Sequence, residues 1–131
     1  MARTAVAYSN WVPNGSLTDP AGTATNAGAG NGHVIPAAAA AGSAKAVPEL
    51  TLLRVVAGAT GGNITVKAGV NPPDMAASQG DLVVAVPNSG TVWIGPFESG
   101  RFIQKDGTML VDVATGFVAG TITAFRVPRN T

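Results

Sequence analysis

Between Asp81 and Val127, short apolar runs alternate with residues that favour turns. In the runs Leu82–Val86 and Met109–Val113, large apolar residues occupy every second position. Side chains of a β-strand point alternately to the two faces of a sheet, so this period of two predicts strands with one buried face. The runs are too short, and too closely spaced, for helices.

Each apolar run ends at residues that reverse the direction of the chain. Glycine permits positive φ, proline fixes φ, and Asn or Asp bonds to its own local backbone. The turn segments are Pro87–Gly90, Gly95–Pro96, Glu98–Gly100, Lys105–Gly107 and Thr115–Gly116. This half of the chain is therefore predicted to be a series of antiparallel strands with tight connections.

The same pattern extends towards both ends of the chain. Residues 49–57 form a long apolar run, residues 63–68 alternate cleanly, and residues 120–127 form a last strand. A short strand is also expected at residues 3–8, within an N-terminal strand segment of residues 1–12. About eight strands with this spacing predict an all-β fold of two packed sheets, a β-sandwich or jelly roll over residues 49–131.

Residues 13–48 differ in kind from the predicted strands. Alanine and glycine dominate this segment, and its larger aliphatic residues are Leu17, Val34, Ile35 and Val47. Such a composition buries too little apolar area to offset its ordering entropy. The segment is predicted to be a long Gly/Ala-rich arm or loop with at most one helical turn, at residues 37–46, and a flexible linker is the alternative. As an arm it would become ordered on binding a partner, with Trp11, Leu17, Val34 and Ile35 as its anchors.

Charge is scarce in this protein. Charged residues make up 11% of the 131 residues, against about 25% in a typical globular domain. This deficit suggests that much of the surface faces protein rather than water. The net charge is +1, and the basic residues form no cluster of the kind that binds nucleic acid. A membrane is not an expected partner either.

The chain lacks the residue patterns of common catalytic and metal sites. It has no cysteine, and its single histidine, His33, lies in the segment with the weakest pattern and is expected to be solvated. No Gly-x-Ser-x-Gly elbow, phosphate-binding loop or calcium-binding loop occurs. No catalytic residue, metal ligand or cofactor is therefore predicted, and the protein is not expected to be an enzyme.

The aromatic residues carry the candidate binding chemistry. Exposed on a β-sandwich, Trp93 and Phe97 would form a platform on which a sugar ring stacks, whereas buried they would fill the core. We expect Phe102 and Phe125 in the core, leave both interpretations open for Trp93, and expect Trp11 at a subunit contact. The predicted assembly contacts are Trp11, Leu17, Val34, Ile35, Trp93 and Phe97.

Residues 63–129 resemble a family of small virion structural proteins encoded by tailed phages of actinobacteria. The matching stretches are the opening MARTAV and the later TVKAGVNPP, QGDLVVAV, TVWIGPFESGRFIQKDG and GTITAFRVPR. The resemblance implies a capsid decoration (cement) protein that is assembled in the host cytoplasm onto the outer surface of the head shell. Its partners would be the major capsid protein and further copies of itself, with a trimer favoured by the three-fold sites of shells. Residues 13–48 depart from the family pattern.

A second class of function stays open beside this one. The protein would then be a carbohydrate-binding or host-surface-binding module of a phage head or tail appendage. An assembly protein should bury its aromatic residues between subunits and occur in many copies per particle. A binding module should present an aromatic site on the free monomer and occur in few copies.

Overall fold

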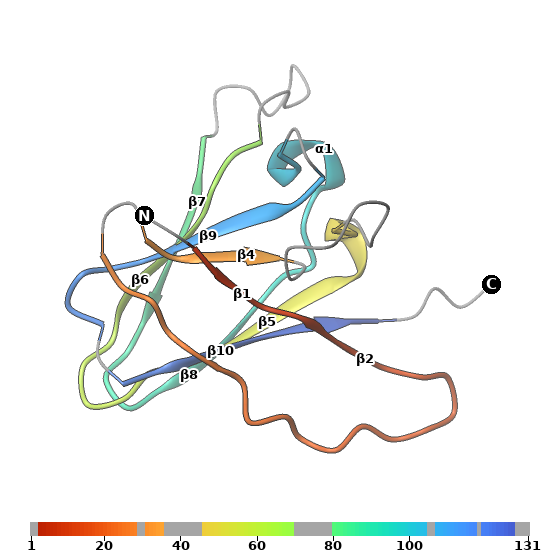
Figure 1. The fold of residues 1–131 in the computed structure, drawn as a ribbon, viewed down its shortest axis with the longest axis horizontal. Coiled ribbons are helices and arrows are strands. Elements are labelled where there is room, and N and C mark those ends of the chain that lie inside the picture. The colour runs from red at the N-terminus through yellow and green to blue at the C-terminus, as the bar shows by residue number, and fades with distance from the viewer. Residues whose placement is uncertain are drawn as a thin grey trace.

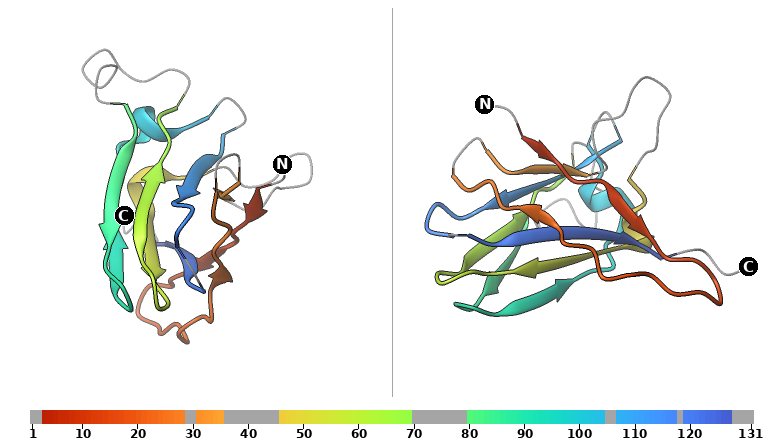
Figure 2. Two further views of the ribbon diagram at one scale, coloured as in Figure 1. Left: turned by 90° about the vertical axis from the view of Figure 1, so that its left-hand side faces the viewer. Right: turned by 60° about the horizontal axis from the view of Figure 1, so that its bottom comes forward.

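The computed structural model describes residues 3–28, 31–35, 46–69, 80–104, 107–117 and 119–127. Across these residues the chain forms two packed sheets, seen as two layers of strands in Figures 1 and 2. Two single-turn helices, η1 (Pro48–Leu50) and α1 (Ser99–Phe102), lie at one end of the sandwich. The predicted all-β, two-sheet fold is confirmed. The possible helical turn at residues 37–46 falls outside the described residues except for Ala46.

The first sheet, sheet A, has the strand order β1–β4–β9–β6–β7. Its strands are β1 (Thr4–Ala5), β4 (His33–Ile35), β9 (Met109–Val113), β6 (Gly62–Val66) and β7 (Leu82–Val86). β1 runs parallel to β4, and the other pairs in this sheet are antiparallel. Sheet A is therefore a mixed sheet with β1 and β7 at its two edges.

The second sheet, sheet B, has the order β2–β10–β5–β8. Its strands are β2 (Tyr8–Asn10), β10 (Thr121–Arg126), β5 (Thr51–Val56) and β8 (Thr91–Ile94), together with β3 (Thr23–Ala24). One edge of β10 pairs with β5, and the other edge is shared by β2, which is parallel to it, and β3, which is antiparallel. β10 is thus the strand that holds sheet B together.

The core lies between the sheets and follows from strand alternation. In β9 every second residue is buried, as the period of two predicted. β5 alternates in the same way, which the unbroken apolar run at residues 49–57 did not predict. Large side chains buried from both sheets include Leu53, Val55, Ile64, Met109, Val111 and Ile122. The core is therefore built mainly from aliphatic residues, with Phe97, Phe102 and Phe117 as its buried phenylalanines.

The first strand prediction, residues 3–8, covers strands of two different sheets. β1 belongs to sheet A and β2 to sheet B, and Val6 between them is buried. The Tyr8 hydroxyl of β2 accepts a hydrogen bond from the Val47 amide (3.2 Å) and lies 2.7 Å from Thr51 Oγ1 of β5. Thr51 Oγ1 in turn donates to the Val47 carbonyl (2.6 Å). This closed set of bonds holds residues 46–48 against both β2 and β5.

The described part of residues 13–48 differs from the predicted arm. Residues 23–24 and 33–35 are strands of the two sheets, and β4 lies between β1 and β9. Gly32 makes this close pairing possible, because a Cβ there would collide with the Val111 carbonyl oxygen. Ile35 is fully buried in the core opposite Met109. The strands of the sandwich therefore begin before residue 49 in this structure.

We predict that Ile35→Ala lowers the free energy of unfolding by about 2–5 kcal/mol, because it leaves a cavity in a closed core. Val34→Ala is the matched control, since Val34 lies next to it in β4 but points to the half-buried outer face, and should cost less than about 1.5 kcal/mol. Urea denaturation measures both values. Equal, small losses would place residues 33–35 outside the folded core.

Candidate functional site

The outer faces of the two sheets differ in chemistry. On sheet A, Arg3 pairs with Asp112 (2.6 Å) and Lys67 with Asp81 (2.8 Å), with 4.0 Å between Lys67 and Asp112. The Ala68 amide and then the Lys67 ammonium, which donate to Asp81, hold the pKa of that carboxyl below its usual value. The same bond to Asp81 raises the pKa of Lys67. The outer face of sheet A is therefore charged and internally neutralised.

The outer face of sheet B is largely apolar, and the register of its strands shows why. Arg54 of β5 lies opposite Trp93 of β8 and Thr123 of β10. Leu52, two residues earlier on the same face of β5, lies opposite Phe125. We call this surface the aromatic face and define it by Trp11, Leu52, Arg54, Trp93, Phe125 and Val127.

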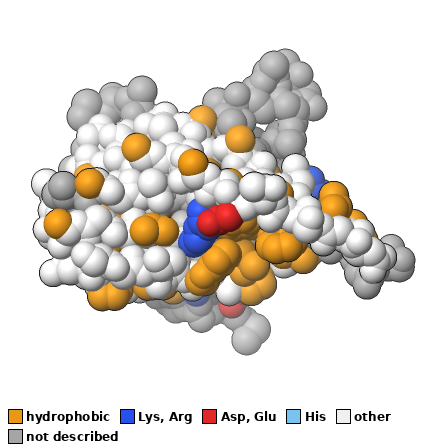
Figure 3. Space-filling model, turned by 90° about the horizontal axis from the view of Figure 1, so that it is seen from below, with side chains coloured by type: hydrophobic (Ala, Val, Ile, Leu, Met, Phe, Trp, Pro, Cys, Tyr) orange, Lys and Arg blue, Asp and Glu red, His pale blue; other side chains and the backbone are white. Residues whose placement is uncertain are grey.

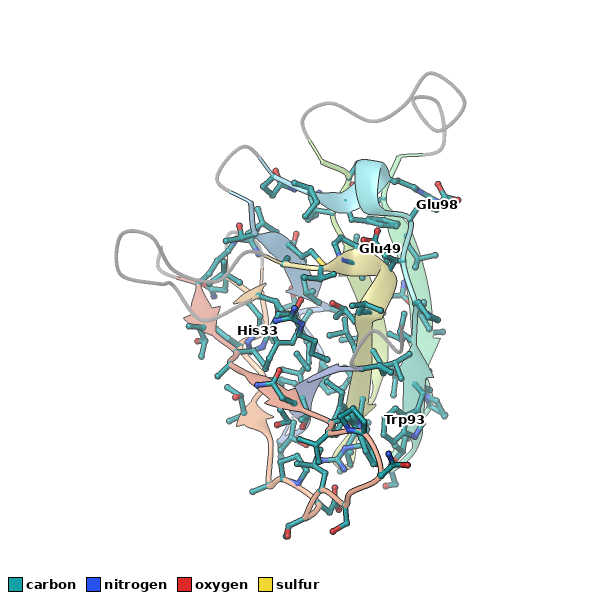
Figure 4. All side chains as sticks on the ribbon, turned by 90° about the vertical axis from the view of Figure 1, so that its right-hand side faces the viewer. His33, Glu49, Trp93 and Glu98 are labelled. Atoms are coloured by element: carbon teal, nitrogen blue, oxygen red, sulfur yellow. The ribbon has the colours of Figure 1, made fainter. Side chains whose placement is uncertain are left out.

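Three aromatic rings form the centre of this face. The Phe125 ring lies 5.3 Å from the Trp93 ring and 6.4 Å from the Trp11 ring, and both pairs are tilted. Only 2% of Phe125 is exposed, although it points away from the core, because the two tryptophans and Arg54 cover it. Trp11 and Trp93 remain 40% and 55% exposed. The two indoles thus rest on a buried ring and present their own surface to solvent (Figure 4, where Trp93 is labelled).

Arg54 is the charged member of the aromatic face; both of its Nη atoms have partners, whereas its buried Nε has no hydrogen-bond partner among the described residues. Its guanidinium lies 6.0 Å from the Trp93 ring and 5.5 Å from the Phe125 ring, within the range of cation–π attraction. Nη2 donates to the Pro20 carbonyl (2.8 Å), and Nη1 forms an ion pair with the exposed Asp19. The charge of Arg54 is therefore balanced on the same chain, and its side chain is only 12% exposed.

Figure 3 views this side of the molecule and shows a basic and an acidic side chain next to a group of hydrophobic ones. A surface with this composition suits an apolar partner better than an anionic one, because its one guanidinium is neutralised. Tryptophan and arginine are also the residues most enriched at the centres of protein interfaces. We therefore treat the aromatic face as the candidate functional site.

The structure divides the predicted assembly contacts into three groups. Trp11 and Trp93 lie together on the aromatic face, 40% and 55% exposed. Leu17 is half-buried in the segment that joins β2 to β3, and Val34 is half-buried on the outer face of sheet A, so neither joins the tryptophans. Ile35 and Phe97 are buried inside the protein.

The burial of Ile35 and Phe97 corrects two of these predictions. Ile35 faces the core from β4. Phe97 packs edge-on against Phe102, with 5.5 Å between the ring centroids. Neither side chain can contact another molecule without unfolding, so Trp93 and Phe97 do not form a shared platform for a sugar.

The expectations for the other phenylalanines had different outcomes. Phe102 lies in the core, as predicted. Phe125 is buried as expected, but beneath the two tryptophans on the outer face of sheet B rather than between the sheets. The sequence contained one signal for this, since Phe125 shares a period of two with Thr121 and Thr123, whereas Ile122 alternates with them.

His33 is not solvated, contrary to expectation, and lies fully buried in β4. Its Nδ1–H donates to the Thr4 carbonyl (3.2 Å), and its Nε2 accepts from the Asn26 amide (3.1 Å). The Thr4 carbonyl and the Asn26 amide together favour the neutral imidazole, because a protonated Nε2 would point its N–H at the N–H of Asn26. Burial lowers the pKa of His33, a nearby Arg3 adds to this effect, and the bond to Thr4 opposes it.

The other labelled titratable groups among the described residues lie away from His33. Figure 4 shows Glu49 and Glu98 near η1 and α1, apart from His33. Within the described ranges no three acidic or histidine side chains are grouped so that they could hold a metal ion. In the same part of the chain no helix has the length and apolarity needed to cross a membrane.

Comparisons of the chain with protein-family models, with curated proteins and with solved structures find no match.

The environment of His33 makes stability depend on pH in a predictable direction. Because its pKa is lowered in the folded protein, the unfolded chain binds more protons just below pH 6.5. The free energy of unfolding should therefore be fully retained above about pH 6.5 and should fall as the pH falls below it.

Urea unfolding between pH 5 and 8 measures this effect, and His33→Gln is the control, since an amide can keep one donor and one acceptor without titrating. The variant should lose part of the dependence on pH that the wild type shows. An identical pH profile in the two proteins would contradict the assignment.

Proposed function

We propose that this protein is a structural virion protein that docks through its aromatic face onto the outer surface of a phage head shell. The observation that carries the proposal is the pair of exposed tryptophans over Phe125 in a chain with only 11% charged residues. A decoration protein needs a contact surface of this kind, because it works by packing and not by chemistry.

The geometry of the aromatic face favours tight docking. Trp11 and Trp93 are already packed against Phe125, so a partner would order few side-chain torsions when it covers them. The guanidinium of Arg54 is held by Asp19 and Pro20, and its burial would leave no unpaired charge. Each tryptophan that a partner fully covers should contribute on the order of 2 kcal/mol or more.

The attribution to a virion rests on the resemblance of residues 63–129 to structural proteins of actinobacterial tailed phages. Three residues of the aromatic face lie inside the resembling stretches: Trp93 in TVWIGPFESGRFIQKDG, and Phe125 and Val127 in GTITAFRVPR. The proposed partners are the major capsid protein and other copies of this chain. The proposed location is the outer capsid surface, reached by assembly in the host cytoplasm.

A carbohydrate-binding or host-surface-binding function is the second candidate, and the exposure of Trp93 favours it. An indole on the outer face of a β-sandwich can stack against a sugar ring, and Trp11 could supply a second ring in place of the buried Phe97. The two functions differ in the number of copies that a particle requires. A cement protein covers a lattice, whereas an appendage is needed at few positions.

Quantitative mass spectrometry of purified particles of the phage that encodes this chain tests the proposal. We expect the protein in a fixed, high ratio to the shell subunit and its release from the shell surface under mild denaturation. A few copies per particle, together with glycan binding that quenches tryptophan fluorescence, would favour the second candidate. Absence from the particle would contradict both.

We predict that Trp93→Ala lowers occupancy of purified shells at least about tenfold, because it removes an exposed indole and uncovers Phe125. Co-sedimentation of labelled protein with undecorated shells measures the occupancy. Asn63→Ala, an exposed change on the outer face of sheet A, is the control and should bind as the wild type does. Unchanged binding of a folded Trp93→Ala variant would exclude the aromatic face as the docking surface.

A further inference from the structure

Within the described residues, β7 is an edge strand without the usual protection against pairing. It is bonded to β6 on one side and ends the strand order of sheet A on the other. Its five residues, Leu82–Val86, are all aliphatic, with no charge and no proline, and Val83 is 55% exposed. Natural edge strands are commonly shortened, charged or bulged to prevent association with other chains. Figure 2 shows β7 at the margin of the molecule in its left-hand view.

The other described edges of the two sheets are shorter. β1 has two residues and follows the ion-paired Arg3. β2 and β3, which share one edge of sheet B, have three and two residues. β8 has four residues and is followed by Gly95–Pro96, and Pro96 has no N–H to donate to another strand. β7 is thus the longest apolar edge in the part of the chain that the structure describes.

The two ends of β7 limit where another strand can pair. At the first end, Asp81 already accepts bonds from the Ala68 amide (2.7 Å) and from Lys67 (2.8 Å). At the other end, Pro87 has no N–H and begins the turn whose Asn88 side chain accepts from the Gly61 amide (2.8 Å). The free edge is therefore the segment Leu82–Val86 and nothing beyond it.

We propose that β7 pairs with β7 of a second copy of this chain, antiparallel about a two-fold axis at Val84. In this register Val84 lies opposite Val84, Leu82 opposite Val86, and Val83 opposite Ala85. Every cross-strand pair is then aliphatic, and the exposed Val83 is covered. The pairing joins two copies of sheet A into one continuous sheet.

The uninterrupted aliphatic run of β7 is complementary to itself, which favours a second copy of this chain, and the charges beside it favour the antiparallel direction. The first end of β7 carries the Lys67–Asp81 pair, whereas the turn Pro87–Gly90 at its other end is neutral. An antiparallel pair places the charged end of each copy beside the neutral turn of the other. A parallel pair would place two aspartates side by side, which costs free energy.

This contact makes a dimer and not the trimer that the resemblance implies. Two identical strand edges in antiparallel pairing are related by a two-fold axis, which closes after two copies. β7 belongs to sheet A, whereas the strands that carry the aromatic face belong to sheet B. The inference does not depend on the proposed function.

A pair of double variants tests the register. In Val83→Lys/Ala85→Lys, each lysine lies opposite a lysine of the other copy, and we expect the dissociation constant of the dimer to rise at least about tenfold. In Val83→Lys/Ala85→Glu, each lysine lies opposite a glutamate, and we expect a dissociation constant within about threefold of the wild type. Sedimentation equilibrium measures all three proteins. Residues 83 and 85 are exposed and lie opposite the uncharged Thr65 and Asn63 of β6. The substitutions should therefore affect the stability of the folded monomer to a similar extent in the two double variants.

Cysteine cross-linking supplies an independent readout, because the chain has no cysteine of its own. Opposed residues have Cα atoms about 5 Å apart, within the range of a disulfide. Val84→Cys should therefore form a disulfide-linked dimer under mild oxidation. Ala85→Cys should not, because Ala85 lies opposite Val83, and not opposite Ala85, of the other copy. A wild type that is monomeric or trimeric, or two double variants that dimerise equally, would overturn the proposal.

Discussion

The antiparallel register between β5 and β10 is the constraint on which the rest of the molecule depends. It places Arg54 beside Thr123 and Leu52 beside Phe125 on the outer face of sheet B. A slip of one residue would turn Phe125 towards the core and Ala124 towards solvent. The same two strands position β8, β2 and β3, so both indoles that cover Phe125 owe their places to this one pairing. The candidate site is thus a property of the sheet and not of a loop.

The strands with a strict period of two were predictable, because alternation alone determines which side faces the core. Leu82–Val86 and Met109–Val113 illustrate this, since both were predicted and both are strands. β4 was not predictable in this way. Its three residues, His33–Ile35, gain their partners β1 and β9 from distant parts of the chain, and local composition favoured an arm. Short strands that depend on such remote pairs leave little periodic signal.

The candidate site was predictable in part. Trp11 and Trp93 were selected because a chain with few aromatic residues has few other anchors, and the structure brings them together over Phe125. The burial of Phe97 was not predictable, because it depends on tertiary packing against Phe102 of α1, which residue types alone do not show. The cover that Arg54 provides could not be foreseen either, since it requires the register of three strands and the ion pair with Asp19.

The pairing of β2 with β10 has a consequence for how the chain is made. A ribosome releases residues 8–10 long before residues 121–126, yet sheet B is incomplete until these segments meet. Folding of this sheet must therefore wait until residues 121–126 have been synthesised, and the many distant contacts make it slow compared with a helical protein of similar length. During that interval Trp11 lacks its native neighbour Phe125, so its indole is exposed on the nascent chain and favours association with other apolar surfaces.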